Sequence, residues 1–185
     1  MQMFMRAYSW RLGMAAVLVT AAACAAGAGV GGAPGGGILG APTVKGNVSI
    51  ALPKEWTVKA GGGDVVLVAL APNADKDPTG KYQARLSISQ DAGNKVDGAV
   101  AQQALTKSVP GYLVVERPMT VTVNGMQGVR FGGTCKSANG DMRTLQYMFT
   151  VNNQIYTIVF TSLATSWNNY QAGIQTSIAT FTVKK

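Results

Sequence analysis

Through most of the chain, hydrophobic residues recur at every second position, and turn-forming residues separate these runs. Val48, Ile50 and Leu52 alternate with small polar residues, which predicts a half-buried strand that ends at Pro53. The run VVLVALA at 65–71 is continuously apolar, so it predicts a central strand covered on both faces. A further strand is predicted for ARLSISQ, with its inward-facing residues at Ala84, Leu86 and Ile88.

Two short turns predict β-hairpins. Asn124-Gly125 stands between two alternating segments, a strong local signal for a type I′ turn. Asn152-Asn153 separates RTLQYMFTV from QIYTIVFTS and predicts a second hairpin. On one side of that hairpin we expect Leu145, Tyr147, Phe149, Val151, Tyr156, Ile158 and Phe160.

The pattern changes to a helical period in two places. Asp97 can cap a helix that runs to about Ser108, where Pro110-Gly111 stops it. Its weakly apolar face would contain Val100, Ala101, Ala104, Leu105 and Ser108. A second helix is predicted within 162–181, capped by Thr165 or Ser166, with a buried stripe of Trp167, Tyr170, Ile174, Ile178 and Phe181.

The order of these elements defines the fold class. Strands come first, then a helix, then about five strands and a terminal helix, and most neighbouring strands join through hairpins. Such an order predicts an α+β domain over 46–185, in which helices flank an antiparallel β-sheet.

The first 23 residues have the pattern of a secretory signal peptide. Met1 to Arg11 carry two positive charges and no negative charge. The apolar run from Leu12 to Ala23 has 12 residues, whereas a membrane-spanning helix needs about 20. A positive segment, a short apolar segment and small residues before a cleavage site are the parts of a leader that is removed.

Cys24 is the predicted attachment point of a lipid. The stretch TAAAC resembles a bacterial lipobox, which implies cleavage between Ala23 and Cys24 and transfer of a diacylglycerol to that cysteine. Ala22 and Ala23 match the pattern, whereas Ala21 departs from the usual Leu. The alternative is ordinary secretion, with Cys24 as a free thiol or as the disulfide partner of Cys135.

Residues 24–45 are predicted to form a Gly/Ala-rich tether. The segment AAGAGVGGAPGGGILGAP has no charge and no period, and 20 such residues would reach about 25 Å. We therefore expect a protein that is lipid-anchored in the cell envelope. In Gram-negative bacteria, a signal that resembles an Asp directly after the lipidated cysteine retains a lipoprotein in the inner membrane. This chain has Ala25 at that position, so in a Gram-negative host we expect the protein in the outer membrane, facing the periplasm.

Composition narrows the chemistry. The chain contains no histidine, which excludes Ser-His-Asp and Cys-His catalysis and the commonest transition-metal ligand. The acidic residues show no paired motif, so we predict no catalytic residues, no metal site, no cofactor and no enzymatic activity.

Cys135 shares its parity with Val129 and Phe131, so it is predicted to be a buried, inert side chain. The net charge of +8 falls to about +6 without Arg6 and Arg11, and the basic residues are too dispersed to predict nucleic-acid binding.

Four segments in this order resemble the PsbP-like and DcrB-like superfamily: VSIALPKEWTV, VTVNGMQGVRF, QYMFTVNNQIYTIVFTS and WNNYQAGIQTSIATF. The resemblance covers about residues 46–183 and implies an α/β/α sandwich around an antiparallel sheet. It also implies an accessory or binding role, and bacterial DcrB-like members are often envelope lipoproteins. It supplies no catalytic residues to transfer to this chain.

These observations leave two hypotheses for function. The first is a non-enzymatic lipoprotein that docks to another component of the cell envelope, with an unidentified protein partner. The second is a carrier of a small amphiphilic ligand in a pocket between sheet and helix, whose ligand-binding residues the sequence leaves unknown. The second rests on the supply of aromatic side chains: Trp56, Tyr147, Tyr156, Trp167 and Tyr170.

Overall fold

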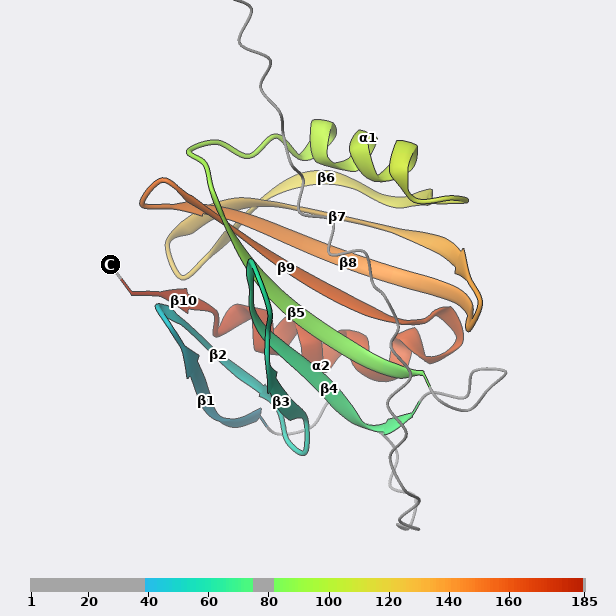
Figure 1. The fold of residues 1–185 in the computed structure, drawn as a ribbon, viewed down its shortest axis with the longest axis horizontal. Helices are drawn as coiled ribbons and strands as arrows, with labels where there is room; N and C mark the ends of the chain where they lie inside the picture. The colour runs from blue at the N-terminus through green and yellow to red at the C-terminus, as the bar shows by residue number, and fades with distance from the viewer. Residues whose placement is uncertain (1–38, 75–81, 185) are drawn as a thin grey trace, which may run out of the picture. The chain divides into compact units, whose positions relative to one another are not determined.

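A seven-stranded antiparallel sheet forms the centre of the molecule (Figure 1). The computed structural model describes residues 39–74 and 82–184. In spatial order the strands of the large sheet are β3 (Thr57–Ala60), β4 (Val65–Ala74), β5 (Gln83–Ala92), β9 (Gln154–Leu163), β8 (Gly140–Val151), β7 (Met126–Ser137) and β6 (Leu113–Val123).

A second, three-stranded sheet pairs β1 (Leu39–Lys45) and β10 (Thr182–Val183) with the two edges of β2 (Val48–Pro53). β1 lies inside the segment that was predicted to be tether, so that prediction is wrong for its last seven residues. The pattern hid this strand because its residues are mostly exposed. The rest of the predicted tether, 24–38, lies outside the described residues.

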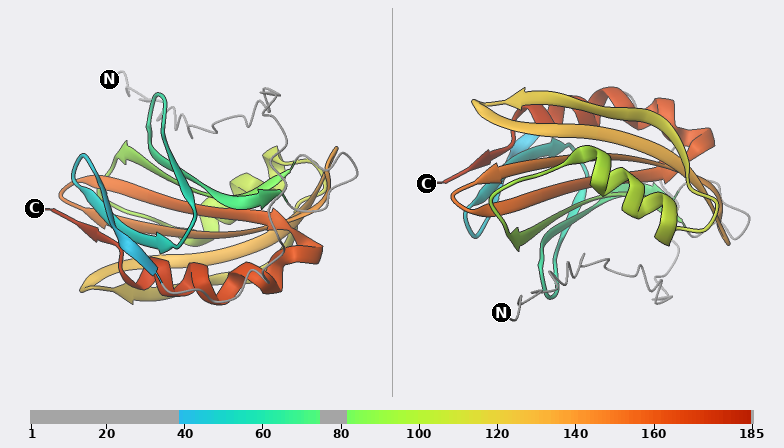
Figure 2. Two further views of the ribbon diagram at one scale, coloured as in Figure 1. Left: turned by 90° about the horizontal axis from the view of Figure 1, so that it is seen from below. Right: turned by 90° about the horizontal axis from the view of Figure 1, so that it is seen from above.

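One helix covers each face of the large sheet. α1 (Gly98–Ser108) packs with Phe131 and Met148, whereas α2 (Trp167–Ala179) packs with Tyr147 and Phe149, which point to the opposite face. The two views in Figure 2 show α1 and α2 on opposite sides of the sheet. The predicted α+β sandwich is therefore confirmed.

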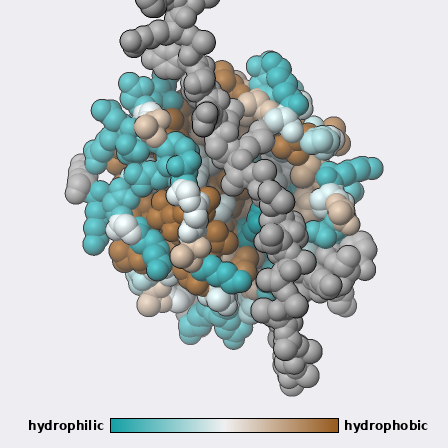
Figure 3. Space-filling model, in the orientation of Figure 1, coloured by the Kyte–Doolittle hydropathy of each residue, from teal (hydrophilic) through white to brown (hydrophobic). Residues whose placement is uncertain are grey.

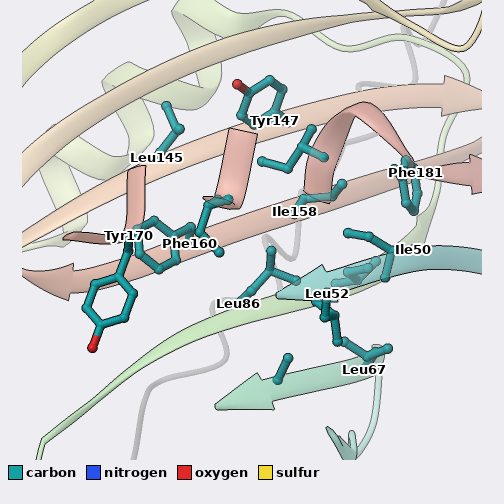
Figure 4. Packing of buried hydrophobic residues seen from close by; sticks show 14 of the residues in the cluster. Ile50, Leu52, Leu67, Leu86, Leu145, Tyr147, Ile158, Phe160, Tyr170 and Phe181 are labelled. Carbon is teal, nitrogen blue, oxygen red and sulfur yellow. The ribbon is translucent and has the colours of Figure 1, made fainter. Parts of the chain in front are cut away.

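The main core lies between the large sheet, β2 and α2. All five residues of the predicted stripe on the last helix are buried in it, although Phe181 follows the end of α2. Phe160 contacts Trp167 and Tyr170 with ring centroids 5.2 and 6.2 Å apart. Figure 4 shows this packing, with the hydroxyl of Tyr170 pointing away from the cluster. The β2 residues Val48, Ile50 and Leu52 close the core from the other side.

Both predicted hairpin turns are present. Asn124 and Gly125 have φ angles of 48° and 77°, and Asn152 and Asn153 have 51° and 57°, the left-handed values that a type I′ turn requires. Behind the second turn, Phe149 pairs with Tyr156, so the expected residues share one face.

Three local predictions are wrong. β4 was predicted to be covered on both faces, but its residues Val68 and Leu70 are only half-buried. Among the described elements, α1 alone covers that face of the sheet, and it packs on β6 and β7, away from β4. Figure 3 shows this side, where apolar surface gathers near β2 and β3 within a polar periphery. Val100 is 47% exposed, since α1 turns Gly98, Ala101 and Gln102 inward instead. Ser166 stands at the start of α2 without a side-chain capping hydrogen bond.

Candidate docking surface

β6 forms one edge of the large sheet, and no strand in the described part of the chain pairs with its outer side. Four of its hydrophobic side chains are largely exposed: Leu113 by 67%, Val114 by 44%, Val115 by 48% and Met119 by 50%. Only two other large hydrophobic side chains among the described residues are this exposed, Val44 and Val100. Exposed apolar side chains on an unpaired strand are typical of a surface that binds another chain. We call the strand with these four side chains the β6 edge.

The irregular course of β6 explains this exposure. Its pairing with β7 slips between Val114 and Glu116 and again between Glu116 and Met119, and Pro118 lies in the second interruption. Such bulges twist an edge strand and limit its pairing with arbitrary strands. From Met119 to Val123 the pairing is regular again, so this part of the outer edge can accept a further strand.

α1 holds β6 in place from one face of the sheet. The carboxylate of Asp97 accepts hydrogen bonds from the backbone nitrogens of Ala99 and Val100 at 2.9 and 3.1 Å, which confirms the predicted cap. Gly98 lets the helix approach Pro118, because a Cβ atom there would lie 2.9 Å from the proline ring. Gln102 Nε2 donates a hydrogen bond of 2.8 Å to the carbonyl oxygen of Glu116.

The start of β6 rests on a second close contact. Tyr112 is buried against Gly133 of β7, where a Cβ atom would come within 2.6 Å of the Leu113 carbonyl oxygen. Burial raises the pKa of Tyr112, so its hydroxyl is neutral at physiological pH. The β6 edge is thus held by packing on α1 and on β7.

An arginine–glutamate cluster lies beside the β6 edge on the other face of the sheet. Glu116 Oε2 is 2.9 Å from Arg130 Nη2 in an ion pair, although the geometry is not that of a hydrogen bond. Arg143 Nη2 donates a hydrogen bond of 3.4 Å to Glu116 Oε1. All three side chains are about one quarter exposed, with relative exposures of 22% to 27%. Two cations share one anion, so the cluster carries one net positive charge.

Aromatic side chains orient the two guanidinium groups. Arg143 lies over the ring of Trp167, 4.5 Å from the ring centroid. Burial would lower the pKa of Arg130, but the contact with the Tyr147 hydroxyl and the charge of Glu116 more than offset this and raise it. Arg130 therefore stays charged, and its Nε atom is buried without a hydrogen-bond partner. Guanidinium groups held in this way can bind an anion.

The cysteines do not form a site within the described residues. Ala23 and Cys24, the predicted cleavage and lipidation positions, lie outside them. Cys135 is half-buried, not fully buried as predicted, because β7 is near its end and close to the edge there. Burial, followed by the charge of Asp141, raises the pKa of Cys135, which lowers its reactivity. The described part of the chain contains no cluster of acidic, cysteine or histidine residues that could hold a metal ion.

The aromatic residues behind the carrier hypothesis fill the core. Tyr147, Tyr156, Trp167 and Tyr170 are each 8% exposed or less, and Trp56 packs against the same cluster. Their abundance is therefore explained by packing. No helix in the described residues is long and apolar enough to cross a membrane.

Sequence reasoning missed the β6 edge and the arginine–glutamate cluster. The segment YLVVERP combines three consecutive apolar residues with a proline, a pattern that signals an exposed, interrupted strand. The cluster had no comparable signal, since Glu116, Arg130 and Arg143 come from three different strands.

The antiparallel sheet with a helix on either face is a PsbP-like fold. No known family model matches the chain, and no curated protein sequence matches it closely. Among solved structures it is similar to LpqN of Mycobacterium tuberculosis, a protein involved in cell envelope biogenesis, with a TM-score of 0.57 and 13% identity over 79% of this chain and 86% of that one.

Two other solved structures share the fold. Cyanobacterial PsbP (CyanoP) from Synechocystis has a TM-score of 0.55 at 11% identity, covering 74% of this chain and 86% of its own. A protein of unknown function from Pseudomonas aeruginosa, described as a putative regulator, has a TM-score of 0.54 at 14% identity, covering 80% of this chain and 99% of its own. At these identities the similarity establishes the fold alone.

Proposed function

We propose that this protein is a non-enzymatic accessory component of the cell envelope that docks to an envelope protein through the β6 edge. The observation that carries the proposal is the exposure of Leu113, Val114, Val115 and Met119 on a strand without an outer partner in the described residues. Exposed side chains and unpaired backbone groups together suit the addition of a partner segment. The absence of histidine and of a motif for catalysis favours binding over chemistry.

The location rests on the N-terminal sequence. The leader 1–23 and the TAAAC stretch favour export and lipid attachment at Cys24. LpqN, which shares the fold, is an envelope biogenesis protein, and this agrees with the same compartment. In a Gram-negative host the anchored protein would face the periplasm from the outer membrane.

The anchor is tested by the intact mass of the mature protein extracted from its native membrane. We expect a chain that begins at Cys24 and carries the mass of a diacylglycerol and a further acyl group. Replacing Cys24 with Ala should release the protein from the membrane fraction. An unmodified thiol at Cys24, or cleavage at another position, contradicts lipid anchoring.

The docking is tested by placing a charge on the β6 edge. Leu113→Glu should abolish co-migration with a larger complex in a native gel of detergent-solubilised envelopes, because the glutamate would have to be buried in the interface. Val44→Glu is the matched control: Val44 is 50% exposed but lies on β1. Equal complex formation by both variants, or migration of the unaltered protein as a monomer, contradicts the proposal.

The carrier hypothesis has less support. Its motivating residues, among them Trp167 and Tyr156, are packed in the core and are 1% exposed. Opening a ligand site between α2 and the sheet would remove packing such as that of Trp167 on Phe160, whose ring centroids are 5.2 Å apart.

A further inference from the structure

The β6 edge and the arginine–glutamate cluster lie side by side. Met119 of β6 pairs with Arg130 of β7, and Glu116 pairs with Gly132. Directly opposite residues on antiparallel strands point to the same face. The exposed side chain of Met119 is therefore a neighbour of the guanidinium group of Arg130.

From this juxtaposition we infer that the partner contributes an extended acidic segment, which adds to the β6 edge and places a carboxylate against Arg130 and Arg143. The inference rests on the proposed docking function and specifies the chemistry of the partner. A segment that pairs with Met119–Val123 could direct alternate side chains to the face that carries the cluster.

The charge balance of the cluster favours a carboxylate. Among the described residues, Glu116 is the one carboxylate paired with these two guanidinium groups, each of which belongs to a side chain about one quarter exposed. Arginine binds carboxylates through two parallel N–H groups, and these charge-assisted bonds are the strong ones. Because Trp167 and Tyr147 hold the two arginines in place, little side-chain entropy would be lost on binding.

A second copy of this chain fits the surface less well. Two β6 strands paired edge to edge would bring the exposed Arg117 and the positive cluster of each copy near those of the other. Without Arg6 and Arg11 of the predicted leader, the chain also carries a net charge of about +6. Like charges across an interface disfavour association, whereas an acidic partner gains from the same charges.

A lipid surface also fits less well. Phosphate headgroups could contact the arginines, but they cannot hydrogen-bond to the unpaired backbone of β6 as a polypeptide can. Arg130 and Arg143 are only about one quarter exposed, at 26% and 27%, and are recessed beside Glu116. A flat bilayer would reach such groups poorly.

The test places a photo-crosslinking amino acid at Met119 in the full chain, in its native envelope, and maps the captured peptide by mass spectrometry. We expect a peptide of another protein that contains Asp or Glu within the crosslinked segment. A captured segment without acidic residues, a segment of this chain or a lipid adduct each overturns the inference. A crosslink to a segment without acidic residues would contradict the acidic partner but not docking through the β6 edge. If neither Met119 nor Leu113 gave a crosslink, docking through the β6 edge would itself be contradicted.

Charge variants in the Met119 crosslinking protein give a second readout. Arg130→Gln and Arg143→Gln should each lower the yield by about tenfold or more, as for the loss of a charge-assisted hydrogen bond. Glu116→Gln should raise or maintain it, because the arginines would lose their internal competitor. Thermal unfolding of each variant separates misfolding from lost binding. If Arg130→Gln and Glu116→Gln change the yield in the same direction in folded protein, the carboxylate assignment is wrong.

Discussion

Two asparagines with the same backbone conformation have different side-chain roles. Asn124 and Asn152 both begin type I′ turns, with φ angles of 48° and 51°. The side chain of Asn124 donates hydrogen bonds of 2.9 Å to the carbonyl oxygens of Ala179, the last residue of α2, and Phe181, two residues further on. Asn152 makes no side-chain hydrogen bond in the described part of the molecule. Sequence predicted both turns, but only the fold shows that Asn124 also ties the β6–β7 hairpin to α2.

Replacing Asn124 with Gly should therefore lower the free energy of unfolding. Glycine keeps the left-handed backbone but removes two hydrogen bonds, each worth about 0.5–1.5 kcal/mol. We expect a loss of about 1–3 kcal/mol in urea unfolding. Asn152→Gly is the matched control and should cost only a few tenths of a kcal/mol, the scale of a change confined to the chain entropy. Equal losses in the two variants would show that the bonds from Asn124 contribute nothing.

At the scale of elements, prediction succeeded where burial alternates and failed where it does not. Buried residues alternate with half-buried ones along most of β5 and β9, so periodicity placed their inward side chains correctly. In β2 and β8 the predicted residues are also buried, except for the half-buried Val151, although neighbouring residues such as Ala51 and Met148 are buried too. β1 and β6 are edge strands with mostly exposed residues, and edge strands need no regular alternation. The apolar face of α1 is narrow, and its pattern did not predict that Gln102 is buried. The position of Gln102 depends on its hydrogen bond to β6, which the sequence of the helix does not show.

The same distinction explains which parts of the candidate site the sequence could provide. The exposure of Leu113 and Val115 follows from the position of β6 at the edge of the sheet. The order of strands in a sheet cannot be predicted from the local periodicity of hydrophobic residues, so this exposure could not be predicted either. The proximity of Glu116, Arg130 and Arg143 requires the register of three strands. A one-residue slip would send their side chains to the opposite face. Only once the register is known does the cluster become visible.

At the scale of the whole molecule, the proposed N-terminal anchor and the β6 edge fit a single role. A lipid at Cys24 and a tether would hold the domain at a membrane surface. This would raise its effective concentration near a partner in the same envelope. The sandwich contributes a rigid support, because β7 and α1 fix the position of β6 from within the sheet and from one face. In this proposal, the positive cluster beside the edge would select an acidic partner by charge.

The most direct measurement of this account is a photo-crosslink from Leu113, the most exposed large hydrophobic side chain of the described residues, formed in living cells. We predict a discrete adduct with one envelope protein at Leu113 and none at Val44, an aliphatic side chain that is 50% exposed on β1. An adduct of equal yield at both positions, or none at Leu113 in cells that contain the protein at its native level, would contradict docking through the β6 edge.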